Sequence, residues 1–221
     1  MNKIESVIKA CNFANSFFKE IISNFRFKTE KELDRCIRGY ARKNRLRLAF
    51  PPIIGSGKNA AEIHHKPNNA KLKGFTVIDY GFKVNGYCCD MTRTVFIGKP
   101  TKKQVELYNK VKKVQLASIK DVKEGIKYSE LDMKSRKRFG KLKKFFVHAL
   151  GHGVGKEVHQ NPKISPKSNR FAKLKDVITI EPGVYFKGKE GIRIEDTVVV
   201  RKMMAEVLTK ASKELIIIKN K

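Results

Sequence analysis

Two segments of this chain carry the same pattern of apolar residues and acids, and this repeat constrains the fold more than any other feature of the 221 residues. In the first segment, Asp79 ends an apolar and β-branched run and Asp90 precedes a second run. In the other segment, Glu181 and Glu195 hold the equivalent places. Each segment therefore predicts an antiparallel hairpin with a carboxylate on both strands. The repetition predicts a fold with two similar halves.

The register of the first hairpin follows from its turn. Asn85-Gly86 is the strongest two-residue hairpin signal, and with this pair as the turn Asp79 faces Thr92. Asp90 lies two residues from Thr92 and on the same face, because side chains alternate along a strand. The two aspartates then become diagonal neighbours with backbones about 7–8 Å apart. Buried carboxylates this close need a counter-charge, and a pair of divalent cations would supply it.

The segment between the hairpins, HALGHGVGKEVH, supplies His148, His152 and His159. The first two have the spacing of a helical HExxH zinc site, but Ala149 stands in place of the glutamate and three glycines would break a helix. We therefore expect these histidines on loops or strands, with separate roles. Four carboxylates and a histidine together predict a two-metal site.

The rest of the chain predicts helices and short strands. Apolar residues at helical spacing predict an amphipathic helix over about residues 2–24. Capping boxes predict two more helix starts, at Thr29 with Glu32 and at Thr101 with Gln104. The other expected elements are the end of the third helix near 122, a helix over about 129–139, and strands near 46–50 and 214–219. Strand blocks that alternate with helices in two similar halves predict the α+β class, as one pseudo-symmetric domain over residues 1–221.

Composition indicates an intracellular globular protein. No apolar run reaches the roughly 18–20 residues of a membrane span, and no secretory apolar region opens the chain. We therefore expect a cytoplasmic protein with no membrane partner. The cysteines form no CxxC pair, and we expect them to be reduced packing residues. They are Cys11, Cys36, Cys88 and Cys89.

The chain is strongly basic. Lys and Arg total 49 against 21 Asp and Glu, which gives a formal net charge of +28. Such a charge favours polyanionic partners such as nucleic acid or a ribosome surface. The basic residues are nevertheless spread along the whole chain, without the aromatic residues of an RNA-binding sheet between them. We therefore expect a lysine-rich surface first, with weak polyanion or ribosome association as the alternative.

Five sequence motifs occur in an order that resembles a known family. They are IIGSGKNAAEIHHKP, DYG with DMTRT, VHALGHGVGKEVH, TIEPGVY and GIRIEDT. Together they resemble the catalytic domain of the pita-bread metallopeptidases, in the Xaa-Pro branch that contains prolidase and aminopeptidase P. The eleven-residue step from Asp79 to Asp90 fits this branch better than the methionine aminopeptidase branch. The resemblance covers nearly the whole chain and implies the pseudo-symmetric pita-bread fold.

The resemblance implies a set of metal ligands and a reaction. The ligands would be Asp79, Asp90, His152, Glu181 and Glu195, with Asp90 and Glu195 bridging two divalent ions. Oxygen-rich ligands with one imidazole suit Mn or Co, with Fe or Zn as alternatives. The implied reaction is hydrolysis of the amino-terminal Xaa-Pro bond of a peptide by a hydroxide that bridges the ions. Glu181 would move a proton from the water to the leaving nitrogen.

Other family positions fall on residues that would contact the substrate or orient the ligands. His64 and His159 match histidines that contact the substrate at the scissile bond and stabilise the developing oxyanion. His148 matches a histidine of the pocket that receives proline. Tyr185 and Arg193 match residues that orient the carboxylates.

Members of the Xaa-Pro branch usually carry a separate amino-terminal domain that caps the site and helps in dimerisation. Fewer than sixty residues precede the first motif here, so we expect a bare catalytic domain, either a monomer or a homodimer. Two alternatives stay open at this point. One is a non-catalytic pita-bread module that binds ribosome or nucleic acid, against which all five ligands argue. The other is a methionine aminopeptidase, against which the Xaa-Pro motifs argue.

Overall fold

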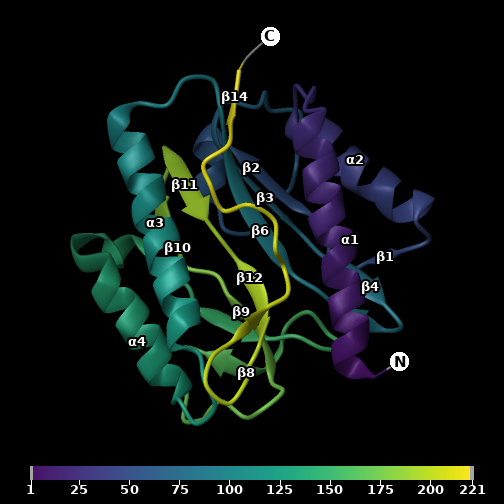
Figure 1. Cartoon of the computed structure of the whole chain (residues 1–221). Helices are drawn as coiled ribbons and strands as arrows, with labels where there is room; N and C mark the ends of the chain where they lie inside the picture. Colours follow the sequence, from purple (N-terminus) through teal and green to yellow (C-terminus); the bar gives the residue numbers. More distant parts are fainter. Residues whose placement is uncertain (1, 220–221) are drawn as a thin grey trace.

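The computed structural model describes residues 2–219, which form an α+β fold of two similar halves (Figure 1). Figure 1 shows two helices on one side of the central strands and two on the other side. The helices are α1 (Lys3–Ser23), α2 (Glu30–Lys43), α3 (Lys102–Asp121) and α4 (Tyr128–Phe139). Two short 3-10 helices complete the helical part, η1 (Gly57–Ala61) and η2 (Gly140–Phe145).

The strands form two larger sheets and two small ones. The first larger sheet has the order β14 (Ile217–Ile218), β6 (Met91–Ile97), β3 (Gly74–Tyr80) and β2 (Ile53–Ser56). The second has the order β13 (Glu206–Val207), β12 (Asp196–Val199), β9 (Val177–Ile180), β7 (Gly151–Gly153) and β8 (Gln160–Ile164). The small sheets contain β1 (Arg47–Leu48), β4 (Phe82–Val84) and β5 (Tyr87–Cys88), and β10 (Gly183–Phe186) with β11 (Glu190–Arg193). The predicted acid-bearing strand pairs are β3 with β6 and β9 with β12.

The predicted register of the first hairpin is confirmed. Asp79 pairs with Thr92. Asn85 and Gly86 both have positive φ, 49° and 79°, as a type I′ turn requires. This turn sets the pairing of β3 with β6, because every residue pair in the hairpin is counted from it. Asp79 and Asp90 are therefore brought to the same face of the sheet.

The predicted helices occur at the expected places, and one capping prediction is wrong in part. Thr101 and Gln104 form the complete capping box at the start of α3. At α2, Thr29 accepts a hydrogen bond from the Glu32 N–H, but the Glu32 carboxylate accepts from the Lys28 N–H instead of the Thr29 N–H. The Glu32 carboxylate thus bonds to the N–H one residue before the N-cap, and the Thr29 side chain still caps α2.

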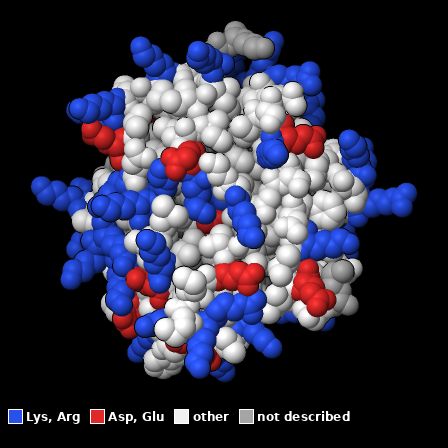
Figure 2. Space-filling view, in the orientation of Figure 1, with Lys and Arg blue, Asp and Glu red and all other residues white. Residues whose placement is uncertain are grey.

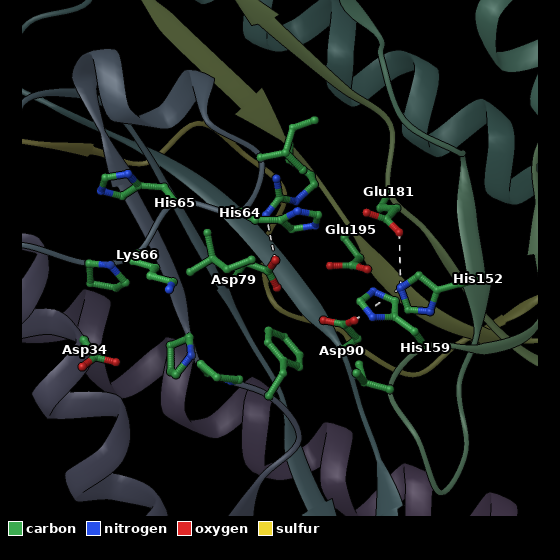
Figure 3. A pocket seen from close by; sticks show the side chains of 18 of the residues that line it. Asp34, His64, His65, Lys66, Asp79, Asp90, His152, His159, Glu181 and Glu195 are labelled. Atoms are coloured by element: carbon green, nitrogen blue, oxygen red, sulfur yellow. Dashed lines mark hydrogen bonds and ion pairs between the residues drawn. The ribbon is translucent and has the colours of Figure 1, made fainter.

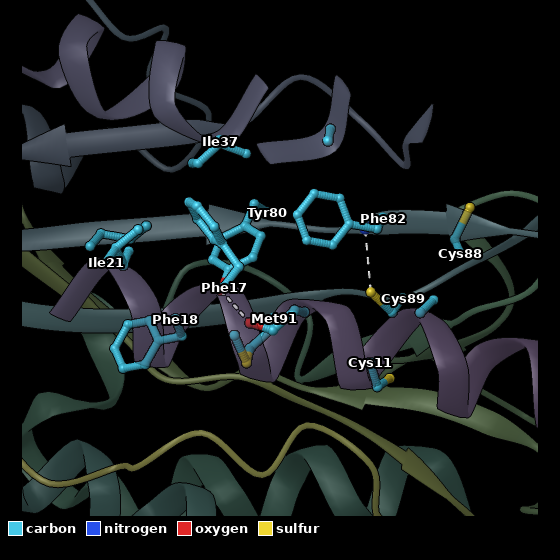
Figure 4. Packing of buried hydrophobic residues seen from close by; sticks show 14 of the residues in the cluster. Cys11, Phe17, Phe18, Ile21, Ile37, Tyr80, Phe82, Cys88, Cys89 and Met91 are labelled. Carbon is cyan, nitrogen blue, oxygen red and sulfur yellow. Dashed lines mark hydrogen bonds between the residues drawn. The ribbon is translucent and has the colours of Figure 1, made fainter. Parts of the chain in front are cut away.

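An aromatic core fixes α1 against the first hairpin (Figure 4). The Phe17 ring meets Tyr80 edge-on, with ring centroids 5.2 Å apart, and lies 6.2 Å from Phe82. The Tyr80 hydroxyl donates a hydrogen bond to the Ala14 carbonyl at 2.8 Å. Aromatic pairs of this kind add stabilisation beyond the area they bury. Strand β3, which contains Asp79, is thus packed firmly against α1.

The cysteines and the charged surface agree with the expectations from composition. The cysteines are free thiols, and Cys11, Cys88 and Cys89 are fully buried packing residues. No helix in the described part of the chain is long and apolar enough to cross a bilayer. Figure 2 shows basic side chains scattered over the whole visible face, with uncharged surface between them. Their spread agrees with the expected lysine-rich surface.

Candidate metal centre and active site

The predicted metal ligands line one cavity of about 490 Å³ between the two halves (Figure 3). Asp79 lies in β3 and Asp90 directly before β6, both in the first half. His152 lies in β7, Glu181 directly after β9 and Glu195 directly before β12, all in the second half. The two acid-bearing strand pairs therefore face each other across the cavity, as the sequence repeat predicts.

The ligand atoms are close enough to share ions. One atom each of Asp90, His152 and Glu195 lies within 4.8 Å of the others. The His152 Nε2 atom is 3.4 Å from Glu181 Oε1 and 3.6 Å from Asp90 Oδ2. His152 is in a strand, as predicted, and its imidazole is the only nitrogen ligand of this cluster among the five predicted residues.

The acids of this cluster fit divalent cations. Asp79 Oδ1 and Asp90 Oδ1 are buried and have no hydrogen-bond partner among the described residues. Burial and then the Glu195 charge raise the pKa of Asp90 well above its usual range, and burial and then Glu181 do the same for Glu195. Burial raises the pKa of Glu181 to about 8. Carboxylates that are buried together repel, and divalent ions remove this repulsion while they occupy the unpaired oxygen atoms.

The hydrogen bonding of His152 prepares it as a ligand. Its Nδ1 atom is 3.2 Å from the Gly153 carbonyl, which can only accept, so Nδ1 carries the proton. Burial and then His159 lower the pKa of His152 to about 4, so the imidazole is neutral near pH 7. The lone pair of Nε2 therefore faces the carboxylates, which is the state that binds a metal ion.

A chain of hydrogen bonds runs from Asp79 to the predicted proline-side histidine. Arg193 donates to Asp79 Oδ2 at 2.7 Å and to the Tyr185 hydroxyl at 3.0 Å. The Tyr185 hydroxyl is 2.9 Å from His148 Nε2, while His148 Nδ1 is 2.7 Å from the Ala149 carbonyl. The His148 Nδ1–H therefore donates to Ala149, and Tyr185 donates to Nε2. Arg193 contacts a predicted ligand directly, whereas Tyr185 reaches it only through Arg193.

The other predicted site histidines occupy different positions. His64 and His159 line the cavity, and the His159 ring centroid lies 4.2 Å from that of His152. His148 is not among the described residues that line this cavity, because it lies behind Arg193 and Tyr185. Burial and then Arg193 lower the pKa of His148 to about 3. Burial also lowers the pKa of His159. Both imidazoles are thus neutral near pH 7.

Two threonines that sequence reasoning missed hold the ligands in place. Thr92 donates to Glu195 Oε2 at 2.8 Å and accepts from the Arg193 Nε–H at 3.1 Å. Thr179 donates to Glu181 Oε1 at 3.2 Å. The strand period of two was the available signal: Thr92 lies two residues from one predicted ligand, and Thr179 two residues from another.

Comparison with known proteins assigns the family. The model of metallopeptidase family M24 matches residues 5–202, and the chain belongs to this family, in its Xaa-Pro aminopeptidase and prolidase branch. The chain is 36% identical over 221 residues to the Xaa-Pro dipeptidase of Pyrococcus furiosus, an alignment that covers 97% of this chain and 63% of that protein. The family implies divalent metal ions, in agreement with the acidic cluster.

Solved structures of related enzymes have the same fold. The X-Pro aminopeptidase of Thermotoga maritima matches with a TM-score of 0.93 and 34% identity, over 98% of this chain and 63% of that chain. The prolidase of Pyrococcus furiosus matches with a TM-score of 0.90 and 34% identity, over 95% of this chain and 64% of that chain. The expected pita-bread fold is thus confirmed. The chain spans less than two thirds of each of these enzymes, and 48% of two Mycoplasma relatives.

Proposed function

We propose that this chain hydrolyses the bond between the first residue of a peptide and a proline in the second position. The observation that carries the proposal is the convergence of four acids and His152 on one cavity, with two buried carboxylate oxygen atoms left unpaired. The Xaa-Pro motifs and the relatives of the same branch support the choice of bond. Members of the family include both dipeptidases and aminopeptidases, so the family assignment does not give the length of the substrate peptide.

The residues of the cavity would divide the work as follows. Asp79, Asp90, His152, Glu181 and Glu195 would hold two divalent ions, Mn or Co in our proposal, with Fe or Zn as alternatives. When bound, such ions lower the pKa of water and polarise the scissile carbonyl. Glu181 would take the proton of the attacking water and deliver it to the leaving nitrogen.

The histidines that line the cavity would bind the peptide. His64 and His159 line the cavity and would donate hydrogen bonds to the carbonyl oxygen, where negative charge develops. Hydrogen bonds through Arg193 and Tyr185 connect His148 to Asp79. These hydrogen bonds would keep the proline pocket in a constant position relative to the ions. Thr92 and Thr179 would hold the bridging and terminal carboxylates in a geometry that needs little reorganisation during the reaction.

Metal analysis and a peptide panel test the proposal together. We expect two divalent ions per chain after dialysis against Mn or Co, and cleavage of Xaa-Pro peptides in preference to Met-Ala peptides. The panel contains an Xaa-Pro dipeptide, an Xaa-Pro-x tripeptide and a Met-Ala-x tripeptide, each assayed with Mn and with Co. Absence of metal in the folded protein would rule out the enzyme and leave the binding module. Preferential removal of methionine would instead identify a methionine aminopeptidase.

Substrate length is a second expected result. The described residues contain no separate domain over the cavity that could reject long peptides by steric clash. For a polypeptide of residues 1–221 we expect Xaa-Pro-x peptides of three or more residues to be cleaved at least as well as Xaa-Pro dipeptides. The measurement is kcat/KM for a dipeptide and a pentapeptide with the same first two residues. A dipeptide preference of tenfold, about 1.4 kcal/mol in transition-state binding, would contradict the expectation.

A further inference from the structure

A buried carboxylate lies beside residues 62–68, the loop that contains His64, and outside the metal centre. Glu30, the first residue of α2, is 0% exposed and accepts hydrogen bonds from Ser56, the last residue of β2, and from several groups of the segment that follows β2. The donors and distances are the Ser56 N–H at 2.9 Å, the Asn59 amide at 2.9 Å, the Asn68 N–H at 3.2 Å and His65 Nε2 at 2.8 Å. A buried carboxylate is costly unless it is hydrogen-bonded in this way. Glu30 therefore binds residues 56–68 firmly to α2.

His65 is the only ring in this arrangement, and it bonds at both nitrogen atoms. Nε2 faces Glu30 and Nδ1 is 2.8 Å from Glu62 Oε2. Burial lowers the pKa of His65, but the hydrogen bonds and charges of Glu62 and Glu30 outweigh it, so the pKa is raised. Both nitrogen atoms can then donate, which makes this a charge-assisted contact and a strong one. The imidazole is 7% exposed.

The residues on both sides of His65 belong to the active site. His64, His65 and Lys66 all line the cavity. His64 and Lys66 are exposed, whereas His65 is buried and both of its ring nitrogen atoms face carboxylates. Figure 3 shows His64 beside Asp79, and His65 on the side away from the acidic cluster. The side chain of His64 makes no hydrogen bond with another described residue. The position of His64 therefore depends on its backbone, and the side chain of the neighbouring His65 is the restraint that lies next to it.

We propose that the Glu30–His65 contact is a positioning device for His64, and this inference rests on the proposed function. Residues 62–68 form no helix or strand. Their other backbone hydrogen bonds lie mainly at the two ends, at Glu62 and Asn68, and between these ends the described bonds include only that of the His65 N–H to the Glu62 carbonyl. A misplacement of about 1 Å in a group that touches the reacting atoms can lower a rate by about 100-fold. Glu30 does not line the cavity, and both ring nitrogen atoms of His65 are bonded to carboxylates, so we expect neither residue to bond to the substrate. They act through His64 alone.

A double-mutant cycle with His64 tests this role. We expect His65→Ala to lower kcat/KM for an Xaa-Pro-x peptide by about 10- to 100-fold, mainly through kcat, with two metal ions still bound. In a His64→Ala background the same change should cause less than a twofold further loss, because its target is already absent. An equal loss in both backgrounds would show a general structural effect, and no loss in either would remove the role. Both results would overturn the proposal.

Matched variants separate the buried contact from the exposed one. Glu62 is 67% exposed, so Glu62→Gln should have a much smaller effect than His65→Ala, because Glu30 still holds the ring. His65→Gln keeps one donor that can reach Glu30 and should recover part of the activity. Glu30→Gln removes the buried charge, and if that variant does not fold, His65→Gln carries the comparison. A Glu62→Gln loss as large as that of His65→Ala would contradict the assignment to Glu30.

Amide hydrogen exchange tests the Glu30–His65 contact without an activity assay. His65→Ala should raise the exchange rates of amides in residues 62–68 by at least tenfold, while amides in β3 and β6 stay unchanged. Exchange that is unchanged in residues 62–68 would overturn the proposal even in an active enzyme. If the wild-type protein cleaves no Xaa-Pro peptide, the proposed function fails, and the exchange data still show whether the contact restrains the segment.

Discussion

Replacement of Glu195 by alanine is expected to empty the metal site and to lower kcat/KM by about 10³- to 10⁵-fold, roughly 4–7 kcal/mol of transition-state stabilisation. Glu195 is 2% exposed and has one oxygen atom within 4.8 Å of both Asp90 and His152. Without it, Glu181 is the only predicted carboxylate ligand left in the second half, and both ions should be affected because Glu195 is proposed to bridge them. Metal content per chain and kcat/KM on an Xaa-Pro-x peptide are the two measurements. Asp90→Ala should behave in the same way.

Two variants provide the comparison for Glu195→Ala. His159→Ala should keep the metal ions and mainly lower kcat, because His159 is proposed to stabilise the transition state and not the ions. Thr92→Val removes the hydrogen bond to Glu195 Oε2 with little change of shape, and should weaken metal binding by about 10- to 100-fold. Loss of metal in His159→Ala would contradict these assignments, and so would full metal content in Glu195→Ala.

Arg93→Ala is expected to destabilise the fold by about 3 kcal/mol, because it breaks a buried ion pair from one side while Lys213 stays paired with Asp196. Arg93 is 1% exposed and donates to Asp196 Oδ1 at 2.7 Å, and Asp196 is 0% exposed. Arg93 also donates to the carbonyls of Glu195 and Ala211, so it ties the two sheets to the C-terminal segment. Urea unfolding should give a lower midpoint with an unchanged slope.

Arg201→Ala is the matched control for Arg93→Ala. Arg201 pairs with Glu206, but the two side chains are 37% and 44% exposed. An exposed pair of this kind contributes about 0–1 kcal/mol, so the control should leave the urea midpoint almost unchanged. If Arg93→Ala and Arg201→Ala lower the free energy of unfolding by similar amounts, the buried pair does not have the role that its burial indicates.

The sequence by itself determined the local elements and the face on which each acid lies. The Asn85-Gly86 turn determined that Asp79 pairs with Thr92, because a two-residue turn sets the pairing of every residue in its hairpin. The repeat of acid-bearing strands predicted a fold with two halves, and the spacing of Asp79 and Asp90 indicated metal. These signals act over a few residues, so a linear pattern records them. The roles assigned to the individual site residues stay predictions until they are measured.

Only the tertiary structure decided which faces meet and which residues support the ligands. Glu30 and His65 are 35 positions apart, and Arg93 and Asp196 are 103 positions apart. The placement of His148 behind Tyr185 and Arg193 also depends on the packing of three separate segments. Strand and helix periods report which side of an element is buried, but not which other element covers it. That choice results from many weak contacts summed over the whole chain, and no local pattern contains it.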